Sequence, residues 1–175
     1  MRIVAGRWRG RRIRPPSDAR VRPTADRVRE AWMSIVNPYI VDARVLDLFA
    51  GSGALGLEAL SRGAASADLV EVSAASVRAI RENADLLGAG DALRVHRGDA
   101  IRFIEKLEAG AFDLAFADPP YGNGLARAVV ERWLSVPFAT VLGVEHEAKE
   151  VMPPGDTQKY GSTAITFYRV NRAEF

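Results

Sequence analysis

Apolar and polar residues follow a helical spacing near the amino terminus and a strand-and-helix alternation from residue 43 onward. Apolar residues recur every three to four positions between Thr24, which suits a helix N-cap, and the helix-ending pair Asn37-Pro38. Short runs rich in Val, Leu and Phe then predict strands at 44–49, 67–72, 92–96, 112–117 and 139–145. Helical spacing fits the segments between these strands, at 53–62, 74–87, 100–108 and 124–134.

This alternation predicts an α/β fold of the doubly wound, Rossmann-like type. Parallel strands joined by helices place helices on both faces of one sheet. After residue 146 no long helical pattern remains, and Ser162–Val170 is typical of one strand in a terminal antiparallel hairpin. We therefore expect an N-terminal basic arm and helix over residues 1–40 and an α/β domain over residues 41–175.

The first fourteen residues precede a proline-rich linker and predict a short β-hairpin or an extended arm. Gly6 and Gly10 mark breaks between apolar positions, and Trp8 lies near the expected turn. The Trp8 ring either stacks on a nucleic-acid base or packs beneath the arm, and the pattern favours neither arrangement.

Charge is distributed unevenly along the 175 residues, whose net charge is only +2. Residues 1–29 hold ten arginines against two aspartates, a balance of +8, so the remaining 146 residues sum to −6. A basic end on an acidic body points to a polyanionic partner held by one segment. The chain's 21 arginines and three lysines favour bidentate phosphate binding, although genomic GC bias explains part of that ratio.

The composition excludes several classes of chemistry. The 48% of hydrophobic residues suit a globular domain, and the absence of cysteine excludes disulfides, thiolate metal sites and a cysteine nucleophile. His96 and His146 lack partners at metal-ligand spacing, so we expect surface histidines and no metal site. The cluster Glu145-His146-Glu147 is expected on a solvated edge, with a cap on the sheet end near the pocket as the alternative. No apolar run reaches the roughly 18 residues of a membrane span, and no secretory signal is recognised. We therefore expect a cytoplasmic protein without a membrane partner.

A glycine-rich loop follows the first strand predicted within the α/β domain. Gly51, Gly53 and Gly56 form G-x-G-x-x-G at the start of a helix, and Glu71 ends the next strand twenty residues after Gly51. Several nucleotide cofactors, NAD among them, share this fingerprint. Asp47 at the preceding strand tip would repel a pyrophosphate but suits a cation. It therefore favours S-adenosylmethionine, which carries a sulfonium and an ammonium group and no phosphate.

Three carboxylates are expected to meet at the carboxyl ends of successive strands, because these ends form the ligand crevice of a parallel sheet. We expect Glu71 to accept hydrogen bonds from two ribose hydroxyls and Asp99 to accept one from the adenine amino group. Asp99 is also a typical helix N-cap residue. The predicted cofactor-binding set comprises Asp47, Phe49, Gly51, Gly53, Glu71, Asp99 and Ala100.

The tetrapeptide Asp118-Pro119-Pro120-Tyr121 ends the fourth predicted strand and carries the candidate chemistry. Its prolines remove two N–H donors, so backbone carbonyls and the Asp118 side chain form a group of acceptors without donors. An exocyclic amine with two N–H groups is the complementary partner, and hydrogen bonds to both hydrogens orient its lone pair toward an electrophilic methyl group. Tyr121 can stack on the base, a contact worth about 1–3 kcal/mol. The structural alternative is a rigid turn, and we predict Asp118, Pro119 and Tyr121 as catalytic.

The tetrapeptide and the segment 47–63 resemble the S-adenosylmethionine-dependent amino-methyltransferases. The segments 2–12, 22–30 and 159–163 narrow the resemblance, over nearly the whole chain, to the bacterial 16S rRNA guanine-N2 methyltransferases. This resemblance implies a seven-stranded methyltransferase sheet, mostly parallel with an antiparallel C-terminal strand. It also implies methyl transfer to the N2 amine of one guanine, held by Asp118 and Tyr121, in the small ribosomal subunit or its assembly intermediate.

The resemblance also places 16S rRNA at the basic amino-terminal segment, where residues 22–30 would line the RNA entrance. We expect the arm to supply mostly phosphate contacts and the protein to act as a monomer. The predicted RNA-binding residues are Arg7, Trp8, Arg9, Arg11, Arg22, Thr24, Arg27 and Arg29.

Three alternatives remain open at this point. A DNA amino-methyltransferase acting on adenine N6 or cytosine N4 would use the same tetrapeptide, but such enzymes usually need additional mass for base flipping. An NAD-dependent oxidoreductase would explain the glycine-rich loop and Glu71 but not Asp47 or the tetrapeptide. A non-catalytic RNA-binding or ribosome assembly factor would keep the fold, and only an activity assay excludes it.

Overall fold

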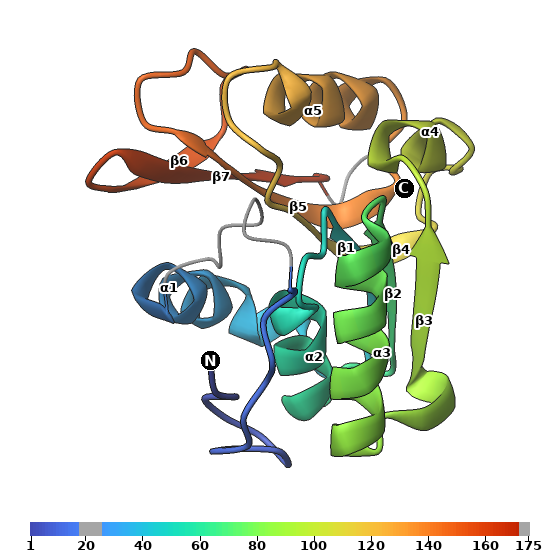
Figure 1. Ribbon diagram of the computed structural model, residues 1–175. Coiled ribbons are helices and arrows are strands. Elements are labelled where there is room, and N and C mark those ends of the chain that lie inside the picture. The colour runs from blue at the N-terminus through green and yellow to red at the C-terminus, as the bar shows by residue number, and fades with distance from the viewer. Residues whose placement is uncertain (18–25, 172–175) are drawn as a thin grey trace.

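Seven strands form one sheet in the computed structural model, which describes residues 1–17 and 26–171 (Figure 1). They are β1 (Arg44–Leu48), β2 (Ser66–Glu71), β3 (Leu93–Arg97), β4 (Phe112–Ala117), β5 (Ala139–Glu147), β6 (Asp156–Tyr160) and β7 (Thr163–Arg169). Their order across the sheet is β3-β2-β1-β4-β5-β7-β6. Strands β1 to β5 are parallel, and β7 lies antiparallel between β5 and β6. The expected seven-stranded, mostly parallel sheet is confirmed.

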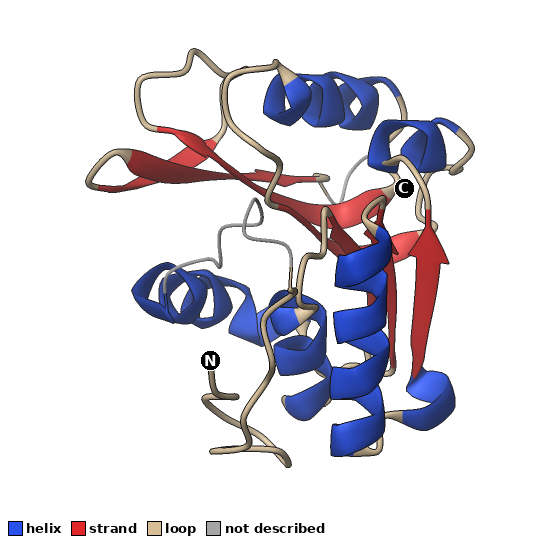
Figure 2. Ribbon diagram, viewed as in Figure 1, coloured by secondary structure: helices blue, strands red, loops and turns tan. Residues whose placement is uncertain are grey.

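Helices cover both faces of this sheet in the described part of the chain (Figure 2). On one face lie α1 (Asp26–Val36), α2 (Ala54–Ser61) and α3 (Ala74–Leu87), and on the other lie α4 (Ala100–Glu105) and α5 (Leu125–Ser135). Side chains alternate between the two faces along each strand. On β1, for example, Val45 joins the core beneath α1–α3, and Leu46 and Leu48 join the core beneath α4 and α5.

The end of α4 differs from the sequence prediction, because the helix stops at Glu105 and not at residue 108. The Arg132 guanidinium reaches across from α5 and donates to the carbonyls of Ile104 at 3.2 Å, Glu105 at 3.0 Å and Leu107 at 3.3 Å. The last carbonyls of a helix have no partner within it, so the Arg132 guanidinium satisfies carbonyls at and just beyond the end of α4.

The amino-terminal arm forms the predicted hairpin and lies below α1 and beside α2 in Figure 1. Ile3 N donates to Arg11 O at 2.9 Å, and Ile13 N donates to Met1 O at 3.0 Å. Ile3, Trp8 and Ile13 are buried and belong to the hydrophobic core beneath α1–α3. The arm therefore shares a core with the sheet, and the domain boundary at residue 40 stays a prediction.

Polar side chains of α2 hold the backbone of the arm. The Glu58 carboxylate, fully buried, accepts from Val4 N at 3.0 and 3.1 Å. Ser61 Oγ donates to Ala5 O at 2.6 Å and accepts from Trp8 N at 3.0 Å. These buried hydrogen bonds satisfy arm groups that would otherwise lose their contact with water, so they fix the arm in one position.

Candidate active site

Four carboxylates lie on one face of the sheet, at the carboxyl ends of neighbouring strands. A residue next to each of them packs in the core beneath α4 and α5, namely Leu48, Val70, Ala117 and Val144. Because side chains alternate along a strand, the carboxylates point to the opposite face, which α1–α3 cover. They are Asp47 of β1, Glu71 of β2, Asp118 directly after β4, and Glu145 of β5.

These side chains line a cavity of about 600 Å³. Nearly all of the predicted cofactor-binding and catalytic residues line it as well: Asp47, Phe49, Gly51, Glu71, Asp99, Ala100, Asp118, Pro119 and Tyr121. Gly53 does not line the cavity but occupies the N-cap position of α2, where its φ of 82° suits glycine. The structure thus brings the predicted set together, while the individual roles of its members stay predictions.

Close packing between α2 and the sheet positions Asp47. A Cβ atom on Gly56 would lie 2.9 Å from Leu69 Cδ1 and 3.2 Å from Asp47 Oδ2, so only glycine lets the helix approach this closely. The approach allows Gly56 N to donate to Asp47 Oδ2 at 2.9 Å. The third glycine of the loop therefore serves packing and fixes the Asp47 carboxylate in place.

Burial and mutual repulsion perturb the carboxylates of the cavity. Burial raises the pKa of Asp47 well above its usual range, against the hydrogen bond from Gly56, and the charges of Asp118 and Glu71 raise it further. Burial also raises the pKa of Glu71, against hydrogen bonds from Ser73 N and Gly51 N to its carboxylate. A cation bound between these groups would favour their ionised forms, so the electrostatics of the cavity suit a positively charged ligand.

Asp99 caps a helix and also lines the cavity. Its side chain accepts from Arg102 N at 2.9 Å and caps α4, so the helix-cap interpretation is confirmed. The residue is exposed and lines the cavity at the same time. A carboxylate has two oxygens, and the cap bond leaves further acceptor capacity toward a ligand.

All four residues of the tetrapeptide 118–121 line the cavity. Asp118 is half-buried, Pro119 is buried and Tyr121 is 36% exposed. The Tyr121 hydroxyl lies 3.0 Å from Thr163 Oγ1, at the start of β7. Two separate elements therefore hold the Tyr121 ring, and Thr163 is a lining residue that the sequence analysis did not identify.

Glu145 is a site residue for which the sequence analysis preferred the wrong one of two interpretations. The expectation of a solvated edge is wrong, because Glu145 is 6% exposed and lines the cavity. His146 is 2% exposed and not on the surface, and its Nε2 lies 2.7 Å from Thr166 Oγ1 within the sheet. The rule that placed Asp47 and Asp118 at strand ends applies equally to Glu145 and could have identified it.

Some predicted RNA-binding residues prove to be buried. Trp8 is 7% exposed, so its ring packs in the core beneath the arm and does not offer a free stacking surface. Arg29 is 1% exposed because it donates to Arg2 O at 2.8 Å and pairs with Asp26 at 3.2 Å. Exposed members of the set are Arg7, Arg9, Arg11 and Arg27, and Arg22 and Thr24 lie outside the described residues.

Residues 1–17 and 26–171 contain no group of three or more His, Cys, Asp or Glu side chains arranged to hold a metal ion. Within the same ranges, no helix has both the length and the apolar character that crossing a membrane requires.

Comparison with known proteins identifies the family. The family model described as conserved hypothetical protein 95 matches residues 1–169. Ribosomal RNA small subunit methyltransferase D of Escherichia coli (strain K12) is 40% identical over 158 residues, covering 87% of this chain and 78% of that protein. The protein of the same name from Haemophilus influenzae is 32% identical over 178 residues, covering 97% and 92%.

Solved structures agree with this assignment. The yhhF protein of Escherichia coli superposes with a TM-score of 0.83 at 36% identity over 97% of both chains. An RNA methyltransferase from Salinibacter ruber in complex with S-adenosyl-L-homocysteine has a TM-score of 0.67 over 86% of this chain and 95% of that one. At 14% identity, this second likeness concerns the fold alone. From the family model and the two relatives, the chain belongs to the ribosomal RNA small subunit methyltransferase D family.

Proposed function

We propose that this protein transfers a methyl group from S-adenosylmethionine to the exocyclic N2 amine of a guanine in 16S rRNA of the small ribosomal subunit. The observation that carries the proposal is that one cavity joins the glycine-rich loop, the carboxylates Asp47 and Glu71, and the tetrapeptide 118–121. The names of the relatives, which are ribosomal RNA small subunit methyltransferases, support a ribosomal RNA substrate.

The cavity fits S-adenosylmethionine better than a dinucleotide. The ionised carboxylates of Asp47 and Glu71 would repel a pyrophosphate and attract a cation, and such a cation would offset the rise in pKa that burial causes in both groups. Phe49 and Val72 add apolar surface for an adenosine moiety. Glu71 would accept from the ribose hydroxyls and Asp99 from the adenine amino group. When bound, the cofactor supplies an electrophilic methyl group on its sulfonium.

The tetrapeptide would orient the amine. Asp118 and the carbonyls beside Pro119 and Pro120 accept hydrogen bonds from its two N–H groups, and Tyr121 stacks on the base. With the amine held so, its lone pair would be directed at the methyl group that the cofactor supplies, and the sulfur would keep the electron pair of the broken C–S bond. The Asp118 carboxylate would accept the proton that the nitrogen loses.

A pair of carboxylates supports guanine over the other bases. Ala117 pairs with Val144 in the parallel register of β4 and β5, so Asp118 and Glu145 directly follow a register pair on the same face. The Watson–Crick edge of guanine presents N1–H and N2–H donors side by side, which two carboxylates match. Adenine and cytosine instead present a ring-nitrogen acceptor next to their amine. That acceptor would face the Glu145 carboxylate, another acceptor, with no donor between them.

Replacing Glu145 tests this match. We expect Glu145→Leu to lower kcat/KM for guanine methylation by about 10–100-fold, because an unpaired buried N1–H costs roughly 1–3 kcal/mol. Glu145→Gln keeps a neutral acceptor, so its kcat/KM should fall less than that of Glu145→Leu. Cofactor affinity should stay unchanged in both, and Glu147→Gln at the edge of the sheet is the control. Full activity of the Leu variant would remove Glu145 from base recognition.

Cofactor affinity should depend on pH through the raised pKa values of Asp47 and Glu71. A cation binds the ionised carboxylates. Cofactor affinity should therefore fall when the pH is lowered through the pKa values of the two groups, which lie above the ordinary carboxyl range. The stability of the ligand-free protein should depend on pH in the opposite sense. Its folded state holds these protons more tightly than the unfolded state, so its stability should increase as the pH falls through the same window and decrease as it rises.

Calorimetry in buffers of different ionisation enthalpy measures the protons released when S-adenosylmethionine binds, and thermal unfolding of the free protein measures the second effect. Asp47→Asn, which removes the most perturbed carboxyl group, should flatten the pH dependence of binding. A cofactor affinity that is the same at acidic and neutral pH would show that these carboxylates do not face a cation.

Transfer of a labelled methyl group tests the function as a whole. Small subunits that lack the modification, deproteinised 16S rRNA and duplex DNA are offered side by side, and nucleoside mass spectrometry identifies the product. We expect N2-methylguanosine from the subunits. If only the DNA is labelled, the substrate is DNA and not ribosomal RNA, although the proposed chemistry of amine methylation still holds. Cofactor binding without any transfer would favour a non-catalytic assembly factor.

A further inference from the structure

A buried asparagine interrupts the apolar face of α3. Asn83 is 1% exposed and follows Ile80 by three residues, so both lie on the side of the helix that packs against the core. The buried residues of the helix are Ser76, Val77, Ala79, Ile80, Asn83 and Leu87. An amide is costly to bury unless its hydrogen bonds are satisfied. The partners of Asn83 therefore explain why a polar residue stands where helical spacing favours an apolar one.

Asn83 joins two segments that are far apart in the sequence. Its Oδ1 accepts from Arg14 N at 2.8 Å, and its Nδ2 donates to Arg14 O at 2.9 Å. The same Nδ2 donates to Ser52 O at 3.1 Å, in the glycine-rich loop. The amide oxygen and both amide hydrogens are thus engaged. A fully satisfied polar group inside a core fixes one arrangement of its partners.

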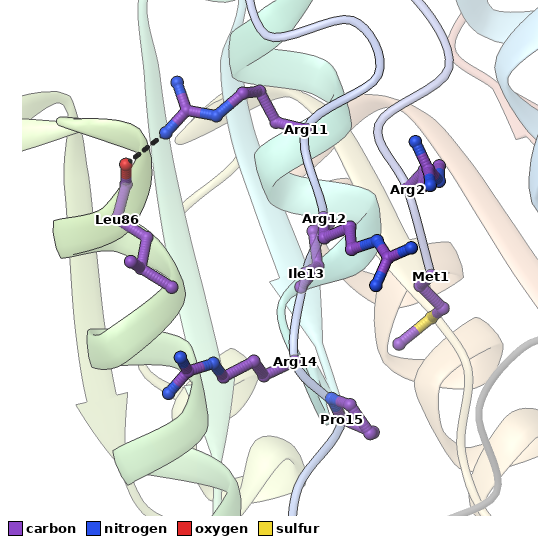
Figure 3. Close-up of a pocket in the computed structure, with 8 residues that line it drawn as sticks. All are labelled: Met1, Arg2, Arg11, Arg12, Ile13, Arg14, Pro15 and Leu86. Atoms are coloured by element: carbon purple, nitrogen blue, oxygen red, sulfur yellow. Dashed lines mark hydrogen bonds between the residues drawn. The ribbon is translucent and has the colours of Figure 1, made fainter.

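The amino-terminal arm lies beside α3 where Asn83 holds it. Figure 3 shows Arg11 and Arg14 directed toward this helix, and the Arg11 guanidinium donates to Leu86 O at 2.6 Å. That hydrogen bond is exposed, whereas the two between Asn83 and the Arg14 backbone are partly buried. Burial shields a hydrogen bond from competing water, so the Asn83 amide does more to fix the course of the arm.

Both partners of Asn83 lead directly into the cavity of the candidate active site. Ser52 lines this cavity, and so does Pro16, two residues after Arg14. Two residues of extended chain span at most about 7 Å, and Pro15 and Pro16 restrict the backbone, so a fixed Arg14 leaves Pro16 few positions. Asn83 itself does not line the cavity. It nevertheless determines how two of the cavity walls lie relative to each other.

We propose that Asn83 is a positioning residue for the binding of S-adenosylmethionine and acts through Ser52 and Pro16. Gly53, next to Ser52, has a φ of 82°, and a glycine backbone has many other conformations available. The hydrogen bond from Asn83 to Ser52 O keeps the loop in one of them before the cofactor arrives, so less order has to be created on binding. The proposal rests on the proposed function for the identity of the cofactor.

Asn83→Ala tests the proposal, with Ser61→Ala as the matched control. Ser61 is also buried and also binds the backbone of the arm, but its partners Ala5 and Trp8 do not line the cavity. We expect Asn83→Ala to raise the Kd of S-adenosylmethionine by about 5–30-fold, the factor that corresponds to fixing one backbone residue on binding. Its kcat at saturating cofactor should change less than its KM for the cofactor. Ser61→Ala should lower the unfolding temperature but leave the Kd unchanged.

Hydrogen exchange of the parent protein provides a second test that needs no variant. The Arg14 amide donates to Asn83 Oδ1, and the Trp8 amide donates to Ser61 Oγ. A bound cofactor that fixes the loop also fixes Asn83, because coupling between two sites is reciprocal. We therefore expect S-adenosylmethionine to slow exchange of the Arg14 amide proton more than that of the Trp8 amide proton, as measured by NMR. This test decides the matter if Asn83→Ala does not fold.

An unchanged Kd in Asn83→Ala, or an equal increase in Ser61→Ala, would overturn the assignment. Equal slowing of the Arg14 and Trp8 amides would overturn it as well, because any ligand that stabilises the whole folded state has that effect. Binding is measured without RNA, so a failure of methyl transfer leaves these outcomes readable. A parent protein that does not bind S-adenosylmethionine would contradict the proposed cofactor and this proposal together, whereas an unchanged Kd in Asn83→Ala would contradict this proposal alone.

Discussion

Asp118→Asn should lower the rate of methyl transfer by about 10²–10³-fold, the usual loss when one oriented polar group is removed from a reacting centre. The substitution keeps the shape of the side chain but replaces one carboxylate oxygen with an N–H donor. That donor would face the amine, so the lone pair of the amine would no longer be oriented and no carboxylate would receive its proton. Asp118 is half-buried in the cavity wall, and its charge contributes to the raised pKa of Asp47.

Single-turnover transfer to small subunits measures the loss, and equilibrium binding of S-adenosylmethionine measures whether the cofactor site survives. The removal of a neighbouring negative charge should lower the pKa of Asp47, so the cofactor site should remain competent. Asp113→Asn is the control, because Asp113 pairs with Arg44 near the start of β4, at the opposite end of the strand that Asp118 follows. Equal rates for both variants would mean that Asp118 does not act on the amine.

Glu71→Ala should weaken S-adenosylmethionine binding by about 10–100-fold, since charge-assisted hydrogen bonds of roughly 1.5–3 kcal/mol to the ribose would be lost. The same carboxylate lies 3.5 Å from Gly51 N and 3.4 Å from Ser73 N, so its loss would also release the glycine-rich loop. The effect should appear in Kd and KM for the cofactor, with a smaller change in kcat at saturation.

Glu82→Ala provides the matched control for this substitution, because Glu82 is an exposed residue of α3. Titration with S-adenosylmethionine and with NADH distinguishes the two cofactor classes that share the glycine-rich fingerprint. If the parent protein binds NADH tightly and Glu71→Ala does not, the result would support the NAD-dependent oxidoreductase alternative. Unchanged S-adenosylmethionine affinity would show that Glu71 does not contact the cofactor.

The sequence by itself determined the order of strands and helices and most of the proposed active site. The helices α1 to α5 and the strands β1 to β5 and β7 follow apolar spacing within short windows, so local periodicity predicts them, whereas the polar strand β6 carries no such signal. The strand-end rule then places Asp47, Glu71, Asp99 and Asp118 at one edge of the sheet, because parallel strands with right-handed crossovers leave their carboxyl ends together. None of these inferences needs a contact between distant residues.

Only the tertiary structure decided what the amino-terminal arm does with its side chains. Trp8 is buried because Ser61, 53 residues later, accepts from its backbone, and Arg14 is held by Asn83, 69 residues later. These hydrogen bonds form only after α2 and α3 pack on the sheet, and no local pattern distinguishes an arginine that faces solvent from one that is buried. The strand-end rule could have placed Glu145 at the cavity, but its burial to 6% exposure depends on how the folded sheet packs.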